Sequence, residues 1–323
     1  MNPPAPSPSL PRRRLLQTLS LLGMSTMGSG AAAGMSPINP RWRTAVGLNG
    51  FESSARKYGR KDPIWEILGA VSDLGFDGME LAHGWPASGG YPKSTEAGRI
   101  RALRRLYAGF DLQIFSIQTG AAEAFDPAAS VRDGWLGQFR DWAALARQLG
   151  CVHVGLWPGG GLRGQTLDQA LDHCARSFRE AGKIAADHGL VAAFEIEPPF
   201  VFNTEEHLRR LLEGADHPAL KTIYDPSHFD LMSGSRGRPH EMLARVGVKN
   251  IGYVHLTDTD GTRRDGGTSK HLAAGDGHAN LPESLRVLRE GGFRGWVMVD
   301  GWEVPDPYDA AAKAKRMLDA AAG

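Results

Sequence analysis

The chain has 323 residues, a hydrophobic fraction of 41%, a charged fraction of 23% and a formal net charge of +1. These proportions suit a globular protein with a full core, and the balanced charge argues against a nucleic-acid or membrane-surface partner, since both usually require a basic excess. A small molecule is therefore the expected partner. The two cysteines, Cys151 and Cys174, make no disulfide framework. Both are expected in the core, with a bridge between them as the alternative in an oxidising compartment.

The first forty residues are not expected to belong to the fold. Three arginines at 12–14 precede an apolar stretch at 19–27 and a run of small residues at 28–34. This order is typical of a secretory signal, and the adjacent arginines resemble a twin-arginine signal. The apolar stretch is too short for a stable membrane span. We therefore expect residues 1–40 to be a signal and linker that exports the protein to the periplasm or beyond. A basic tail is the alternative.

Strand-like and helix-like segments then alternate from residue 43 to the end of the chain. We predict eight strands, at residues 43–48, 77–81, 112–119, 152–156, one that ends at 197, 221–225, 251–256 and 296–300. We predict eight helices, at residues 63–74, 95–109, 131–149, 167–188, from 203 onward, 239–246, 282–290 and 307–321. Asp62 is the expected N-cap of the first helix, with Pro63 as its first residue.

Eight strand–helix units most economically close into an α/β (β/α)8 TIM barrel, which would be a single domain over residues 41–323. A doubly wound open sheet would also alternate strands and helices. It would usually bind a nucleotide through a glycine-rich fingerprint, and the glycine run at 159–161 lacks the Gly-Lys-Ser/Thr tail of a P-loop. The sequence therefore favours the barrel.

Polar side chains mark the ends of the last four strands. Glu195 and Glu197 point to the same side of an extended strand, because strand side chains repeat with a period of two. The three later strands end in the pairs Asp225 and His228, His255 and Asp258, and Asp300 and Glu303. A TIM barrel carries its active site at these carboxyl ends. Carboxylates and imidazoles in a ring there predict a metal site.

Three motifs give the chain a family resemblance. They are Glu195-Ile-Glu197-Pro198 followed by Asn203-Thr204, then Asp225-Pro-Ser-His228, and then His255-Leu-Thr-Asp258 followed by His271-Leu-Ala-Ala-Gly275-Asp-Gly277. In this order they resemble the xylose-isomerase-like TIM barrels, which include sugar phosphate isomerases and epimerases, ketose 3-epimerases, inosose dehydratases and endonuclease IV. The resemblance covers about residues 43 to 320.

The resemblance implies one divalent metal ion held by four strand-end ligands, which are Glu195, Asp225, His255 and Asp300. Mixed carboxylate and imidazole ligation suits Mn²⁺, Mg²⁺, Co²⁺ or Zn²⁺. Asp300 departs from the family pattern, which usually has Glu at the end of the eighth strand. Aspartate is one methylene shorter, so Glu303 could reach in from the loop instead. Asp300 could also simply cap the turn that follows the strand.

Further residues are candidates for catalysis or substrate contact. The resemblance implies catalytic roles for Glu195 and Asp300 and a substrate contact for His228, and it often places a substrate-binding arginine where Arg263 and Arg264 stand. Glu197 is a candidate proton carrier, with a strand-end ion pair as its alternative. The rim of the barrel adds candidate sugar contacts, namely His83, Gln118 and the loop aromatics Trp85, Trp157, Phe200 and Trp302. His83 and Gln118 could equally order loops, the arginines could be solvated, and His153 is expected in the core or at the bottom face.

The ligands imply a mechanism in which the ion polarises a carbonyl and a carboxylate removes the neighbouring proton. We predict a metal-dependent isomerase or epimerase that acts on a carbohydrate and that could be a homo-oligomer. Export shifts weight to the first alternative, a lyase or dehydratase acting on an oxidised sugar or 3-keto-glycoside. A non-catalytic sugar-binding barrel is the second. Endonuclease activity is disfavoured, because it would require more metal ligands and a basic surface.

Overall fold

The computed structural model describes residues 42–82, 92–232 and 237–322. The predicted signal at residues 1–40 lies outside the described residues, as do His83 and Trp85. The signal, and the division of the chain at residue 40, therefore stay predictions. Among the described helices, none combines the length and the apolar character needed to cross a bilayer.

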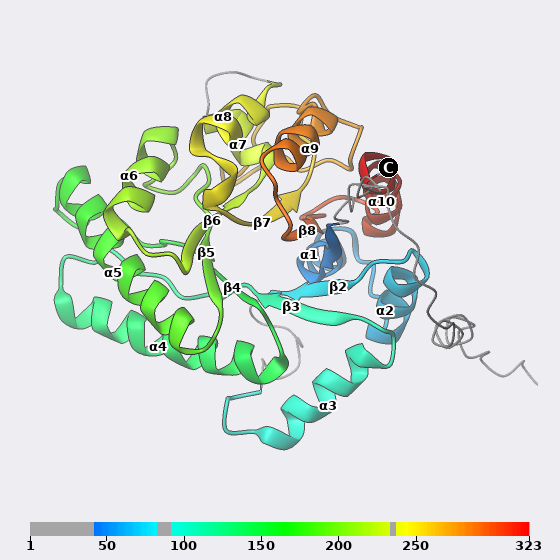
Figure 1. Cartoon of the computed structure of the whole chain (residues 1–323), viewed down its shortest axis with the longest axis horizontal. Helices are drawn as coiled ribbons and strands as arrows, with labels where there is room; N and C mark the ends of the chain where they lie inside the picture. The colour runs from blue at the N-terminus through cyan, green and yellow to red at the C-terminus, as the bar shows by residue number, and fades with distance from the viewer. Residues whose placement is uncertain (1–41, 83–91, 233–236, 323) are drawn as a thin grey trace, which may run out of the picture. The chain divides into compact units, whose positions relative to one another are not determined.

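Eight parallel strands form the barrel (Figure 1). They are β1 (Arg43–Gly47), β2 (Gly78–Leu81), β3 (Gln113–Ile117), β4 (His153–Leu156), β5 (Val191–Phe194), β6 (Leu220–Tyr224), β7 (Ile251–Leu256) and β8 (Trp296–Val299). Their order is β3-β2-β1-β8-β7-β6-β5-β4. The outer strands β3 and β4 meet through a parallel bridge between Gln118 and Gly155 and a 3.0 Å hydrogen bond from Val152 N to Phe115 O. The nearly closed ring confirms the predicted TIM barrel.

Helices surround the strands in Figure 1. They are α1 (Leu48–Tyr58), α2 (Ile64–Asp73), α3 (Ala97–Ala108), α4 (Ala129–Leu149), α5 (Leu167–Asp187), α6 (Glu205–Ala215), α7 (Pro226–Met232), α8 (Pro239–Val246), α9 (Leu281–Glu290) and α10 (Pro307–Ala322), with a 3₁₀ turn at Val248–Asn250. The eight predicted helices are confirmed. The sequence did not predict α1, whose first residue was assigned to the preceding strand, or α7, which has seven residues and starts immediately after β6 and Asp225.

The start of α2 differs from the prediction in its N-cap residue. Asp62 was expected to cap α2, but Pro63 is its N-cap and no side chain caps it. Asp62 instead pairs with Arg60 at 3.0 Å. The backbone of Pro63 is extended, so the Asp62 carboxylate points away from the first turn of α2. Further along the chain, Thr204 caps α6 by accepting a hydrogen bond from His207 N at 3.2 Å.

The barrel interior has an apolar floor. Phe115 and Trp296 stack with ring centroids 4.5 Å apart, and Tyr253 meets the edge of Phe115 at 5.4 Å. His153, at the start of β4, packs against Tyr253 at 5.2 Å, which agrees with its predicted place in the core or at the bottom face. A second and larger core lies between strands and helices and includes Cys151 and Cys174, both unpaired and buried as expected. The floor leaves the polar side chains gathered at the carboxyl ends of the strands.

Candidate active site and metal centre

A cavity of about 400 Å³ lies at the carboxyl ends of the strands. Its walls come from most of the strand-end loops, and its lining residues are Asn49, Glu80, Ala82, Gln118, Trp157, Glu195, Glu197, Pro199, Phe200, His228, His255, Arg264, Asp265, Gly266, Thr268, His271, Asp300, Trp302 and Glu303. All four predicted ligand positions therefore lie in it or, for Asp225, next to it. Asp225 is 1% exposed and follows β6 directly.

Strand alternation decides which side chains reach this cavity. In β2, Met79 and Leu81 pack into the core between strands and helices, so Glu80 between them points inward. In β7 the same alternation sends Tyr253 and His255 inward. A buried carboxylate and a buried imidazole therefore face each other across the barrel.

His255 lies at the centre of a ring of carboxylates. Its Nδ1 is 3.0 Å from Glu195 Oε1 and 3.5 Å from Asp300 Oδ2, and its Nε2 is 3.0 Å from Glu80 Oε2. Burial lowers the pKa of His255, but the charges of Glu195 and Glu80 outweigh burial and hold the pKa well above its usual value. The ring thus concentrates negative charge that a cation would stabilise.

Other groups orient the ligand carboxylates. Trp157 Nε1 donates to Glu195 Oε2 at 3.0 Å. Burial raises the pKa of Glu195, but the neighbouring His255 and His228 outweigh it, so the net pKa is lowered. The carboxylate of Glu195 is therefore ionised and held on one side by an indole and on the other by an imidazole.

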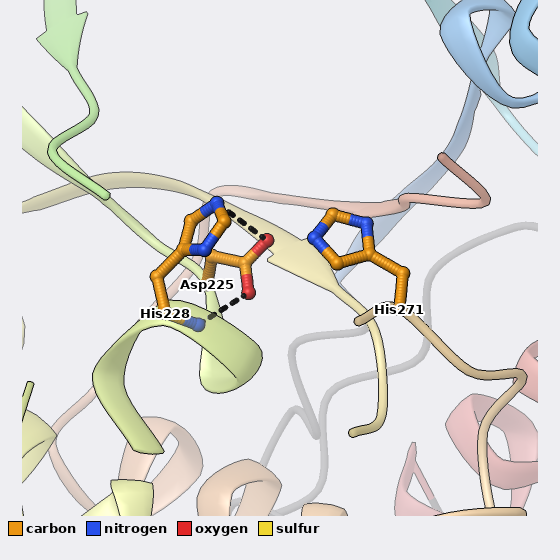
Figure 2. Close-up of side chains that lie close together, drawn as sticks. All are labelled: Asp225, His228 and His271. Carbon is orange, nitrogen blue, oxygen red and sulfur yellow. Dashed lines mark hydrogen bonds and ion pairs between the residues drawn. The ribbon is translucent and has the colours of Figure 1, made fainter. Parts of the chain in front are cut away.

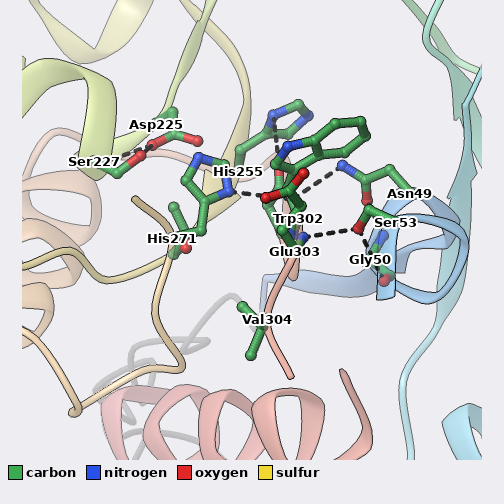
Figure 3. A network of polar contacts seen from close by, with 12 residues as sticks. Asn49, Gly50, Ser53, Asp225, Ser227, His255, His271, Trp302, Glu303 and Val304 are labelled. Carbon is green, nitrogen blue, oxygen red and sulfur yellow. Dashed lines mark hydrogen bonds and ion pairs between the residues drawn. The ribbon is translucent and has the colours of Figure 1, made fainter. Parts of the chain in front are cut away.

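Asp300, which follows β8, is also held by hydrogen bonds. Figure 3 labels its neighbours Asn49, Trp302, His255 and His271. Asp300 Oδ1 accepts hydrogen bonds from Asn49 Nδ2 and from the backbone of Trp302, both at 2.9 Å, which leaves Oδ2 facing His255. Burial raises its pKa, but His271 and His255 outweigh burial, and the pKa is lowered. Glu303 lies 2.5 Å from Lys57 and 3.4 Å from Arg264 and is drawn into that ion pair. Asp300, and not Glu303, is placed to complete the ring.

Asp225, His228 and His271 form a second group beside the ring (Figure 2). His271 Nδ1 lies 3.7 Å from Asp300 Oδ1, across from the Asp225 side chain. Burial lowers the pKa of His271, but the carboxylate of Asp300, with contributions from Asp225 and Glu197, outweighs it and raises the pKa to about 9.

Glu197 is a proton carrier candidate that differs from Glu195. Its carboxylate accepts a hydrogen bond from the Thr268 hydroxyl and lies 3.4 Å from His228 Nε2. Burial raises its pKa, and the charge of Glu195 adds to this against the opposing effect of His228, so the net pKa is raised. The pKa values of two glutamates two residues apart are therefore shifted in opposite directions, as in an acid and base pair.

The donors fit a divalent cation. One ligand atom from each of Glu195, Asp225 and His255 lies within 4.8 Å of the other two. Asp225 Oδ2 is buried and has no hydrogen-bond partner among the described residues, so it is free to bind an ion. With Asp300 these residues would supply three carboxylates and one imidazole, a donor set compatible with Mn²⁺, Mg²⁺, Co²⁺ or Zn²⁺. Ligation by these four residues stays a prediction.

The remaining predicted contacts divide into two groups. Gln118, Trp157, Phe200 and Trp302 line the cavity, so three of the four candidate loop aromatics lie where they could contact a substrate. Arg263 does not line it: this side chain is exposed, and Arg264 lines the cavity instead. The reason is the antiparallel bridge between residues 263 and 269, because adjacent residues of an extended segment point to opposite sides.

Several lining residues had no predicted role, and Asn49, Glu80 and His271 are the ones that contact the predicted ligands. The pattern Gly-Met-Glu-Leu around Glu80 contained the signal, since a strand with apolar residues on one side places its glutamate on the other. His271 stood in a quoted motif without a function. Asn49 lies in a helix that the sequence did not predict.

Residues 258–272 form an arm with a fixed base. Asp258 and Leu272 exchange backbone hydrogen bonds of 3.0 and 2.8 Å, and the Asp258 carboxylate accepts from the backbone of Thr259, Gly275 and Ala279. A Cβ at Gly277 would collide with that carboxylate, which explains the glycine. The base of the arm therefore fixes His271, the residue before Leu272.

Comparison with known proteins identifies the family. The family described as xylose isomerase-like TIM barrel matches residues 68–321. The chain belongs to this family. The resemblance drawn from the sequence motifs is thereby confirmed.

The relatives of this xylose isomerase-like barrel are distant. An inosose dehydratase of Bacillus velezensis is 22% identical over 280 residues, which cover 81% of this chain and 90% of that protein. An uncharacterized protein of Methanocaldococcus jannaschii, MJ1311, is 27% identical over 191 residues, 58% of this chain and 59% of that protein.

Solved structures share the fold at low identity. A zinc-bound IOLI protein has a TM-score of 0.69 and 17% identity over 87% of this chain and 98% of its own. The 3-keto-D-glucoside 4-epimerase YcjR from E. coli, in its apo form, has a TM-score of 0.65 and 17% identity over 87% of this chain and 100% of its own. These likenesses show the fold alone.

Proposed function

We propose that this chain is a divalent-metal-dependent isomerase or epimerase that acts on an uncharged keto-sugar or sugar derivative. The observation that carries the proposal is the convergence of Glu195, Asp225, His255 and Asp300 beside one cavity. Similarity to an inosose dehydratase and to a keto-glucoside epimerase supports sugar chemistry. The zinc bound by the IOLI protein supports a metal-dependent reaction.

The charge of the cavity favours an uncharged substrate. Its described lining includes six carboxylates, from Glu80, Glu195, Glu197, Asp265, Asp300 and Glu303, and a single guanidinium, from Arg264. Arg264 lies 3.4 Å from Glu303 and donates to the backbone oxygens of His271 and Glu303 at 3.0 Å. Its charge is therefore largely compensated. With the cationic His255 and His271 and the proposed divalent ion included, the charges of the described lining roughly balance, so the cavity has no excess of positive charge to select a sugar phosphate. Trp157, Phe200 and Trp302 offer faces for a sugar ring.

The residues divide the chemistry between them. An ion at the four predicted ligands would polarise the substrate carbonyl and stabilise negative charge on its oxygen. Glu195, ionised and oriented by Trp157 and His255, is placed to take the proton from the carbon next to that carbonyl. Glu197, with its raised pKa, can return a proton, and His228 Nε2 at 3.4 Å can exchange one with it.

A second candidate is a lyase or dehydratase acting on an oxidised sugar or 3-keto-glycoside. The observation that favours it is the place of Glu197 in the cavity lining with a raised pKa, because a raised pKa helps a carboxyl group to hold a proton that it could give to a departing hydroxyl or glycoside oxygen. The first step, removal of the proton next to the carbonyl, is the same. The two candidates differ in whether the proton returns to carbon.

Proton exchange in D₂O tests both candidates. The purified protein is loaded with Mn²⁺ or Co²⁺, incubated with D-tagatose, D-psicose, an inosose and 3-keto-glucosides, and followed by NMR and mass spectrometry. Incorporation of deuterium into a product that has lost neither water nor an alcohol supports the isomerase or epimerase, and loss of water or an alcohol supports the lyase. Glu195→Gln should reduce exchange by at least about 1,000-fold, while Glu206→Gln, an exposed control on α6, should not change it. Binding without exchange across the panel would support a sugar-binding barrel instead.

We also propose that residues 1–40 direct export through a twin-arginine route, which fits a substrate without phosphate. Fractionation of cells that express the parent or an Arg12→Lys, Arg13→Lys, Arg14→Lys variant tests this. Retention of the variant in the cytoplasm is the expected result, and export of both proteins would contradict it.

A further inference from the structure

A second pocket of about 400 Å³ lies at the amino ends of the strands, away from the catalytic cavity. Its walls come from the first residues of β4, β5, β6 and β7, from the 3₁₀ turn at Val248–Asn250 and from residues 291–295, which lead from α9 into β8. Among the described residues, none lines both cavities. This amino-end pocket is therefore separate from the site of the proposed reaction.

The amino-end pocket carries positive charge alone. Its ionisable side chains are those of His153, Lys221, Lys249 and Arg294, and no aspartate or glutamate belongs to its described lining. None of the three cations forms an ion pair within the described part of the chain. By contrast, Arg286 on the neighbouring helix α9 pairs with two glutamates. A pocket lined by one sign of charge concentrates ions of the opposite sign.

Lys221 is held at this pocket with hydrogen atoms to spare. Its side chain is half-buried, whereas Lys249 and Arg294 are exposed. The Lys221 ammonium donates to the backbone oxygen of Lys249. An ammonium carries three hydrogens, so two remain for a ligand. Burial lowers the pKa of Lys221, and no carboxylate offsets this effect. A bound anion would favour the charged form of this lysine.

His153 adds a polar atom that the fold does not use. The side chain is 9% exposed and lines the pocket. Its Nδ1 is buried and has no hydrogen-bond partner among the described residues, although buried polar atoms normally have one. Burial lowers the pKa of His153 to about 4, a backbone hydrogen bond with Gly252 opposes this, and the charge of Lys221 lowers the pKa further. The ring is therefore neutral at pH 7, and its tautomer decides whether Nδ1 donates to a ligand oxygen or accepts from a ligand hydroxyl.

We propose that the amino-end pocket binds a small organic anion with two or three negative charges, such as a phosphate monoester or a tricarboxylate. Three cations match this charge, and Arg294 can bind a phosphate or carboxylate group through two nitrogens. The volume lies in the usual range for small-molecule sites, about 300–1,000 Å³. Phe293, Val191 and Val248 line the same pocket and suit the carbon skeleton of the ligand. The proposal does not depend on the proposed function, because the two cavities share no described residue.

Calorimetric titration of the purified whole chain with glycerol 3-phosphate and with tricarballylate, at one fixed ionic strength, tests the pocket. Uncharged glycerol is the ligand control. We expect one bound anion per chain. Lys221→Met removes the ammonium and should raise the Kd about 10–100-fold, the usual loss when a hydrogen bond to a charged group is removed. Lys61→Met is the matched control, because it removes an exposed lysine that does not line the pocket, and its Kd should stay within about twofold of the parent.

Two further variants test the other walls. Arg294→Met changes an exposed side chain and should weaken binding as Lys221→Met does. His153→Phe keeps the ring packing against Phe115 and Tyr253 but removes Nδ1, and should raise the Kd about fivefold. Circular dichroism checks that each variant is folded.

Binding of one anion or of both, weakened in Lys221→Met and retained in Lys61→Met, would support the site, and the preferred anion would tell a phosphate from a carboxylate ligand. Failure of the folded parent to bind either anion would overturn it. So would a Kd that Lys221→Met and Arg294→Met leave unchanged, or one that Lys61→Met raises equally. None of these results would bear on the proposed function, whose exchange assay reports on the other cavity.

Discussion

Replacing Glu80 with glutamine should weaken binding of the metal ion at His255, although Glu80 is not itself a predicted ligand. Glu80 Oε2 lies 3.0 Å from His255 Nε2, and both residues are 2% exposed. The bond orients the ring so that Nδ1 faces Glu195 and Asp300. A hydrogen bond to a charged group contributes about 1.5–3 kcal/mol, and removing such a partner of a metal-bound histidine usually reduces metal affinity about 10–100-fold.

Two different substitutions of Glu80 should give the lower and the upper end of this 10–100-fold loss of metal affinity. Glu80→Gln keeps the shape and one acceptor, so about a tenfold rise in the Kd for Mn²⁺ is expected, whereas Glu80→Ala should approach 100-fold. Isothermal titration calorimetry on the metal-free proteins measures both. Asp230→Asn is a matched control, because Asp230 is a fully buried carboxylate that pairs with His278 at 2.9 Å outside the cavity. A Glu80→Gln variant whose Kd stays within twofold of the parent would refute the orienting role.

Three further predictions follow from contacts at the site and at one helix start. The folded-state pKa of His271 is about 9, against its usual 6.5. The contribution of His271 to the free energy of unfolding is therefore complete below pH 6.5 and is lost as the pH rises through 9. In urea unfolding of the metal-free proteins, the free energy of unfolding of the parent should fall by about 3 kcal/mol more than that of His271→Gln between pH 6 and pH 10. Trp157→Phe removes the donor to Glu195 Oε2 and should lower kcat about tenfold in the D₂O exchange assay with little change in Tm; unchanged kcat would contradict the contact. Thr204→Ala should cost about 1 kcal/mol in urea unfolding by exposing His207 N, with metal binding unaffected.

The sequence predicted the barrel because each of its strands is short, apolar and bounded by a recognisable helix or turn. It missed α1 and α7 because neither is separated from the preceding strand by a turn signal, so Leu48 and Pro226 begin helices where a strand end or a loop was expected. Asn49 was missed together with α1, and so was its hydrogen bond to Asp300. The Asn49 amide and the Trp302 backbone fix Asp300 Oδ1 and turn Oδ2 to His255.

Site residues were predictable where they follow a strand and less so elsewhere. Glu195, Asp225, His255 and Asp300 lie together because parallel strands end at one edge of the barrel. His271 lies 16 positions beyond His255 in the sequence, and only the backbone pairing of Asp258 with Leu272 brings it back to the cavity. Arg263 and Arg264 could not be told apart, since which of two adjacent residues faces the cavity depends on the register of that pairing.

The two ends of the arm at residues 258–272 have different roles: its base positions residues of the site, and its tip borders the entrance of the cavity. Its base is clamped by the Asp258 carboxylate and by two backbone hydrogen bonds, whereas its tip, with Arg264, Asp265, Gly266 and Thr268, borders the mouth of the cavity. Residues can be inserted, deleted or exchanged at positions 265–267 without removing the contacts that hold His271, because these contacts come from the pairing of Asp258 with Leu272 and from Arg264, which donates to the backbone oxygen of His271 at 3.0 Å. The tip is thus the natural place to graft loops of other lengths and so to adapt one catalytic floor to monosaccharides or to bulkier glycosides.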